Sequence, residues 1–117
     1  MTQSYSKTVI VGRLGADPQS HMTPQGTELT RFPMAVSRKT NKGEETTWFS
    51  VTTFGKTAKF CADYLGKGAS VLVEGRLVPD LATGSPKIWH TKSGEARTSY
   101  ELYASEIQAL DKKDDNA

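Results

Sequence analysis

Short runs of β-branched and aromatic residues alternate with polar breaks along most of the chain. Runs of this kind, bounded by proline, glycine and asparagine, are typical of the strands of a small β-protein. Within the second run, Pro33 has no backbone N–H, so it should lie at a sheet edge or a bulge, where no ladder hydrogen bond is needed. The pattern predicts five strands, at residues 7–14, 28–38, 47–54, 70–77 and 97–109, the last being the longest.

A helical spacing interrupts this pattern once, between the third and fourth runs. It predicts a helix over residues 56–65, and Gly66 follows at the position where helices commonly end. The residues at positions i, i+3, i+4 and i+7 that would form its buried stripe are Ala58, Cys61, Ala62 and Leu65.

Three segments between the runs are expected to be loops. Residues 17–26 hold two prolines and a glycine, and residues 39–45 are polar and contain Asn and Gly, which favour a hairpin loop. Residues 78–96 contain two prolines and two glycines, and this composition predicts either a loop or an extended hairpin flap.

The order of three strands, a helix and two strands is that of the OB-fold. We therefore expect an all-β fold, a five-stranded barrel with one helix, of the kind that binds oligonucleotides or oligosaccharides on one face. The 117 residues suffice for one domain, expected at 6–110, between a flexible N-terminus at 1–5 and a disordered charged tail at 111–117. A domain this small buries only about two-thirds of its unfolded surface, which favours an oligomer or a tightly closed barrel.

Charge and composition narrow the possible partners. The formal net charge of +2 supports nucleic acid only weakly. The single cysteine, Cys61, cannot form an intramolecular disulfide and favours a reducing compartment. No run approaches the roughly 18 apolar residues of a membrane span, so no membrane partner is expected.

We expect no enzymatic activity, no metal and no cofactor. The Gly-Lys-Thr at residues 55–57 lies between a strand and a helix, but a P-loop would need a glycine where Ser50 stands. His21 and His90 have no acidic residue or cysteine at ligand spacing. Cys61 falls on the predicted buried stripe of the helix, which is a core position and not that of a nucleophile.

Trp48 and Phe54 are the first candidate binding residues. They lie six residues apart on one predicted strand, so they share a face and stand about 20 Å apart. Ser50 and Thr52 lie between them, which is too polar for a barrel interior, so both aromatics are expected on the surface. An exposed aromatic ring can stack on any base. The alternative is that both are ordinary core or interface residues.

Trp89 is the third candidate and lies within the proline- and glycine-rich segment. Lys87 and Lys92 flank it, so the segment resembles a stacking platform beside cations that bind phosphate. The alternative is a loop anchor that packs on the domain.

Basic residues are interleaved with these aromatics. For any single lysine a solvated face is the ordinary explanation, but several phosphate contacts together would give strong salt dependence. The residues expected near a nucleic acid lie at the second hairpin, at the helix start, between two glycines and on strands: Arg38, Lys39, Lys56, Lys67, Arg31 and Arg76.

Three motifs, in this order, resemble the bacterial and mitochondrial single-stranded DNA-binding proteins. They are Lys-Thr-Val-Ile-Val-Gly-Arg-Leu-Gly-Ala-Asp-Pro at 7–18, Thr-Trp-Phe-Ser-Val-Thr-Thr-Phe-Gly-Lys at 47–56, and Tyr-Leu-Gly-Lys-Gly-Ala-Ser-Val-Leu-Val-Glu-Gly-Arg-Leu at 64–77. The resemblance covers roughly residues 5–110. It implies a homotetramer of OB-folds that coats and protects single-stranded DNA, without sequence specificity, during replication, repair and recombination.

The resemblance also implies roles for single residues. Trp48 and Phe54 match stacking aromatics on the third strand, and Trp89 matches the aromatic of the flap. Phe49 falls where the family has a residue at the subunit interface. The basic positions that approach the DNA backbone match Lys7, Lys56 and Lys67.

The sequence also departs from this family. Lys39-Thr40 stands where another aromatic belongs, and Arg38 and Lys39 would compensate through charge or cation–π contacts. The flap is several residues longer than in bacterial members, and the acidic, hydrophobic tip that recruits partners is missing at the end of the chain.

In these departures the sequence resembles mitochondrial members of the family, including fungal ones. We therefore expect the mitochondrial matrix and nucleoid, with the bacterial cytoplasm as the alternative. A replicative helicase and a DNA polymerase are the implied protein partners. An accessory OB-fold protein that uses the barrel for protein contacts is the second functional hypothesis.

Overall fold

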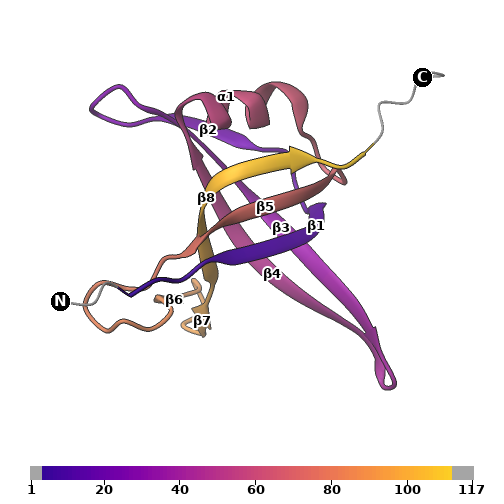
Figure 1. Cartoon of the computed structure of the whole chain (residues 1–117). Helices are drawn as coiled ribbons and strands as arrows, with labels where there is room; N and C mark the ends of the chain where they lie inside the picture. The colour runs from indigo at the N-terminus through magenta and orange to yellow at the C-terminus, as the bar shows by residue number, and fades with distance from the viewer. Residues whose placement is uncertain (1–3, 112–117) are drawn as a thin grey trace.

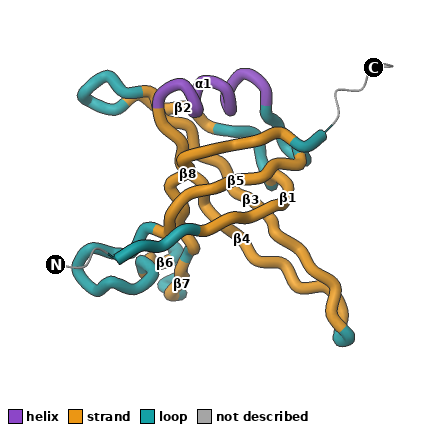
Figure 2. The backbone as a smooth tube through the Cα atoms, in the orientation of Figure 1, coloured by secondary structure: helices purple, strands orange, loops and turns teal. Residues whose placement is uncertain are grey.

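The computed structural model describes residues 4–111 and shows a β-barrel with one helix (Figures 1 and 2). The expected flexible N-terminus and charged tail therefore lie largely outside the described residues. The elements in chain order are β1 (Thr8–Leu14), β2 (Gln19–Met22), β3 (Glu28–Thr40), β4 (Gly43–Phe54), α1 (Gly55–Tyr64), β5 (Ser70–Leu77), β6 (Ile88–His90), β7 (Ala96–Thr98) and β8 (Tyr100–Ala109).

Five strands close the barrel, in the order β1-β5-β8-β4-β3. β1 completes the ring by pairing with β3 at its C-terminal end, where Arg13 lies opposite Ala35 and Leu14 opposite Met34. β4 and β8 run parallel, and the other pairs are antiparallel. This arrangement confirms the predicted five-stranded OB-fold.

Closure brings two backbones unusually close together. A Cβ atom on Gly12 would overlap the backbone carbonyl oxygen of Ala35. Gly12 also pairs with Val71 of β5, so β1 is held between two strands at this point. Only a residue without a side chain lets β1 reach β3 here.

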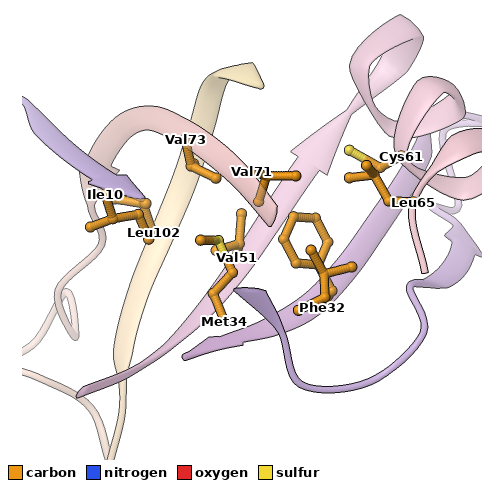
Figure 3. Close-up of a cluster of buried hydrophobic side chains, with 10 residues drawn as sticks. Ile10, Phe32, Met34, Val51, Cys61, Leu65, Val71, Val73 and Leu102 are labelled. Atoms are coloured by element: carbon orange, nitrogen blue, oxygen red, sulfur yellow. The ribbon is translucent and has the colours of Figure 1, made fainter. Parts of the chain in front are cut away.

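Alternate residues of each barrel strand fill the interior (Figure 3). Phe32 and Met34 of β3 and Val51 of β4 meet Val73 of β5 and Leu102 of β8, all fully buried. Cys61 and Leu65 cover the end of the barrel next to the helix. Period-two alternation on the strands thus places the core and also fixes which side chains point outward.

The helix packs on the barrel with a different stripe from the predicted one. Ala58, Cys61 and Leu65 are buried as expected, but Ala62 is exposed. The fully buried positions are i, i+3 and i+7, and Phe60 packs partly buried against the core beside them, so the buried stripe lies on the Phe60 side of the helix and not on the Ala62 side. Burial raises the pKa of the Cys61 thiol to about 11, which keeps it protonated and unreactive.

Two buried threonines tie this helix to the barrel. The Thr30 hydroxyl donates to the carbonyl of Ala58 (2.9 Å), and the Thr53 hydroxyl donates to the carbonyl of Thr30 (3.0 Å). Both hydroxyls are buried and hydrogen-bonded, so the cost of removing them from water is offset by these bonds.

Two predicted loops contain strand instead. Residues 17–26 include β2, whose four residues are all exposed and pair with residues 28–31 of β3. The predicted hairpin loop at 39–45 is also too long, since β3 and β4 continue to Thr40 and Gly43 and form a projecting arm (Figure 1). Backbone pairing extends these polar strands, which bury too little surface to show an alternating pattern.

Pro33 lies inside β3, at neither an edge nor a bulge. β2 pairs with residues 28–31 of β3 and β1 pairs with residues 34–35, so Pro33 falls between the two partners. Its carbonyl accepts a bond from the N–H of Gly15 (2.9 Å), which shows that its backbone faces this gap and not β4. The expectation that no ladder donor is needed there is therefore confirmed.

The segment at 78–96 is part loop and part hairpin. β6 and β7 form a separate two-stranded sheet, with Trp89 opposite Arg97, after a loop at residues 78–87. The predicted fifth strand at 97–109 is accordingly divided between the end of β7 and β8.

Phe32 offers a test of this core, because its side chain is fully buried. We expect Phe32→Ala to lower the free energy of unfolding by about 3–5 kcal/mol in urea denaturation, through lost burial and a residual cavity. Phe54→Ala, the same change at an exposed ring, should cost about 1 kcal/mol. Equal losses for the two variants would contradict this description of the core.

Candidate nucleic-acid interface

The outer face of β4 presents the two predicted aromatics to solvent. Trp48 is 53% exposed and Phe54 is 40% exposed. Between them, Thr52 is buried, and its hydroxyl accepts a bond from Nε of Arg31 (3.3 Å). The alternative that both aromatics are core residues is therefore wrong, and Arg31 lies between them on the neighbouring strand.

The Trp48 indole packs directly against the backbone of Gly15, where no side chain intervenes. A Cβ atom on Gly15 would lie 2.5 Å from Cζ3 of Trp48 and 3.7 Å from Cγ of Pro33. The indole therefore packs over the chain just after β1, next to the point where the barrel closes. About half of the Trp48 surface nevertheless stays exposed to solvent.

Phe54 belongs to an aromatic and cationic cluster that the sequence did not indicate. Tyr103 of β8 meets Phe54 edge-on, with ring centroids 5.2 Å apart and planes at 84°. The guanidinium carbon of Arg76, on β5, lies 5.3 Å from the centroid of the same Tyr103 ring. Tyr103 follows buried Leu102, so strand alternation alone could have placed it on the outer face.

The β6–β7 hairpin brings Trp89 to the same side of the barrel. Its ring is 46% exposed, and its Nε1 donates to the hydroxyl of Ser99 (3.0 Å). A shallow hollow beside it is lined by Ser50 of β4 together with Lys87, Trp89, Ser99 and Glu101. Trp89 is thus anchored through one hydrogen bond and still exposed, and its role as a stacking platform stays a prediction.

The predicted cations are not equally available. Lys7 lies 3.3 Å from the carboxylate of Glu74, and the hydrogen bond and charge of Glu74 raise the pKa of Lys7. Lys7 therefore stays protonated but is partly neutralised. Lys92 is exposed in the turn between β6 and β7. Glu101 places one negative charge in the hollow beside Lys87.

Arg38 and Lys39 lie on the projecting arm and not beside Phe54. They are exposed and stand opposite Glu45 and Glu44 on β4, which offset their charge. Lys39 shares the outer face of β3 with Ala35, the partner of Trp48.

Lys56 and Lys67 lie near the two ends of the helix. Lys56 is exposed in the first turn of α1. Lys67 is exposed in the turn after the helix, where its backbone N–H donates to the carboxylate of Asp17 (2.8 Å).

Phe49, the predicted interface residue, points away from the aromatic face. It is half-buried against the barrel core, and its ring lies 5.6 Å from that of Tyr100. Tyr100 is half exposed, so this pair forms an apolar rim of the barrel.

A metal site and a membrane-spanning helix have little support in the described part of the chain. Residues 4–111 contain no group of three or more His, Cys, Asp or Glu side chains that could hold a metal ion. No helix within the same residues is long and apolar enough to cross a membrane.

The closed five-stranded barrel with a capping helix defines an OB-fold protein, and its exposed aromatics lie on the outer face of that barrel. Residues 5–110 match the single-strand binding protein family. The chain belongs to this family, as the three motifs suggested.

Several bacterial relatives share its sequence. It is 36% identical over 114 residues to a single-stranded DNA-binding protein of Thermotoga maritima, with 93% of this chain and 76% of the relative covered. It is 33% identical to the single-stranded DNA-binding protein of Wolinella succinogenes, with 93% of this chain and 66% of the relative covered. It is 31% identical to that of Neisseria meningitidis, with 97% of this chain and 64% of the relative covered. The chain thus spans about two-thirds to three-quarters of their length. These relatives give no support to a likeness to mitochondrial members.

The packing of Trp48 against Gly15 can be tested directly. In a Trp89→Phe background, we expect Gly15→Ala to displace the Trp48 indole, because an added methyl would overlap it. Its emission should shift to the red and its quenching by acrylamide should increase. Gly66→Ala is the matched control, since a Cβ there would lie 3.5 Å from Oδ1 of Asp17, an ordinary van der Waals contact, and should leave the spectrum unchanged.

Proposed function

We propose that this chain binds single-stranded DNA without sequence specificity and has no enzymatic activity. The observation that carries the proposal is the outer face of β4, where Trp48 and Phe54 stand exposed with Arg31 between them. Trp89 extends this face from the β6–β7 hairpin. Family membership and the names of the bacterial relatives support the same function.

Stacking explains the preference for single strands. The faces of bases are available only in unpaired DNA, and each base stacked on an aromatic contributes about 1–3 kcal/mol. Phosphate contacts from arginine and lysine add affinity but read no base edges. The arginines best placed for this are Arg31 and Arg76, with Lys87 beside Trp89. The more distant cations, Lys7, Arg38, Lys39, Lys56, Lys67 and Lys92, would extend the path of the DNA backbone.

A protein of this kind would coat and protect strands exposed in replication, repair and recombination. The bacterial relatives favour the bacterial cytoplasm over the mitochondrial matrix or nucleoid as its compartment. A replicative helicase and a DNA polymerase stay predictions from the family resemblance alone.

We also propose that the chain assembles as a homotetramer. Val9 and Val11 on the outer face of β1 are 53% and 50% exposed, although both are strongly apolar. β1 pairs with β5 along residues 8–13, and β3 covers its other edge only at residues 13–14. The open edge and the apolar face together suit a second copy of the same strand. Phe49 and Tyr100 offer a further apolar contact.

The stacking proposal predicts a loss of affinity for oligo-dT. We expect Trp48→Ala and Phe54→Ala each to weaken binding about 5- to 100-fold in a fluorescence titration. Tyr64→Ala removes an aromatic that is 75% exposed on the helix, and it should bind as the unmodified protein does. Oligo-dT affinity unchanged in the Trp48→Ala, Phe54→Ala double variant, or equal affinity for duplex, would favour the accessory-protein hypothesis.

The assembly proposal predicts a change of mass. We expect Val11→Lys to shift the protein from tetramer toward dimer or monomer in sedimentation equilibrium, because the lysine would place a charge in one of the two contacts. Leu81→Lys is the control, since Leu81 is 95% exposed in the loop before β6. A tetramer that persists with lysine at both Val9 and Val11 would exclude β1 as the contact.

A further inference from the structure

Tyr103 is an aromatic of the outer face with partners on both neighbouring strands. Thr52 of β4 and Arg76 of β5 lie opposite it in register. Its ring contacts Phe54 edge-on and lies under the guanidinium of Arg76. An aromatic pair and a cation are therefore held together on rigid strands, at the end of β4 away from Trp48.

These side chains line a hollow in the surface. Its volume is about 390 Å³, within the usual range of sites for small organic ligands. Phe54, Arg76 and Tyr103 form one side of it, and Tyr5 and Lys7 approach from the segment before β1. The lining thus combines aromatic rings with two positive charges, which is the chemistry that a nucleotide requires.

The two cations differ in how free they are. Lys7 is paired with Glu74 at 3.3 Å. Arg76 has no carboxylate within ion-pair distance among residues 4–111, and its only described partner is the Tyr103 ring. Arg76 can therefore turn toward a phosphate without breaking an ion pair, and its guanidinium can bind the phosphate through two N–H groups.

We propose that this hollow holds one nucleotide of the bound strand, with its base against the Phe54–Tyr103 pair and its phosphate on Arg76. The inference rests on the proposed function and adds Tyr103 as a residue that contacts DNA. It also makes Phe54 part of a compact site and not an isolated platform.

Three variants test this site by titration with oligo-dT. Tyr103→Val removes the ring but places a β-branched residue, which favours strand, on β8, and we expect affinity to fall about five- to tenfold. Tyr103→Phe keeps the ring and should bind within about twofold of the unmodified protein. Arg76→Gln should reduce the slope of log affinity against log salt by about 0.7, the value for one phosphate on a single strand.

The controls separate this inference from the proposed function. Tyr64→Val makes the same change at an exposed tyrosine on the helix and should leave affinity unchanged. If the unmodified protein binds no oligo-dT, the proposed function itself fails. If it binds but Tyr103→Val binds equally well, only the nucleotide site is overturned.

A second measurement does not depend on the stability of a variant. The unmodified protein is cross-linked by light to oligo-dT in which 5-iodouracil replaces thymine, and the attached peptides are identified by mass spectrometry. We expect attachment at Tyr103 or Phe54 as well as at Trp48. Cross-links at Trp48 and Trp89 alone, with none at Phe54 or Tyr103, would contradict the proposal.

Discussion

The contact between β1 and β3 is the constraint on which the rest of the structure depends. It closes the barrel, and it exists only because Gly12 has no side chain to meet the Ala35 carbonyl. Once the ring is closed, each strand has an inner and an outer face, and alternation assigns every side chain to one of them. Gly15, three residues further on, supports Trp48. Closure and the placement of the first aromatic thus share one short stretch of chain.

The elements with a buried face could be predicted from the sequence, and those without one could not. The strand at 70–77 has the bounds expected from its Val-Leu-Val core, and the exposure of Trp48 and Phe54 follows from their parity. β2 and the projecting arm are polar strands held by backbone bonds, which leave no hydrophobic pattern. Alternation could have placed Tyr103 on the outer face, but its cluster with Phe54 and Arg76 could not be predicted, because those residues come from strands distant in sequence.

The charge that each basic residue presents depends on its acidic neighbours more than on the net charge of the chain. The basic pair Arg38 and Lys39 faces two glutamates across the arm, and Lys7 is held by Glu74. A count of basic residues along the sequence therefore overestimates the charge presented to a polyanion. For the proposed binding of DNA, the arginines beside the aromatics would contribute more than the other cations, because their contacts with phosphate would combine with stacking on the neighbouring rings. A mild net charge is consistent with this arrangement.

The fixed spacing on β4 has a consequence for the length of a ligand. Trp48 and Phe54 are six residues apart on one strand, so their rings stand about 20 Å apart and cannot move closer together. If both rings bind bases as proposed, a DNA strand long enough to span them would gain the second contact at high effective concentration, whereas a fragment of one or two nucleotides would occupy only one ring. On the proposed function, this surface would therefore discriminate by chain length, retaining polymers and releasing the short products of their degradation.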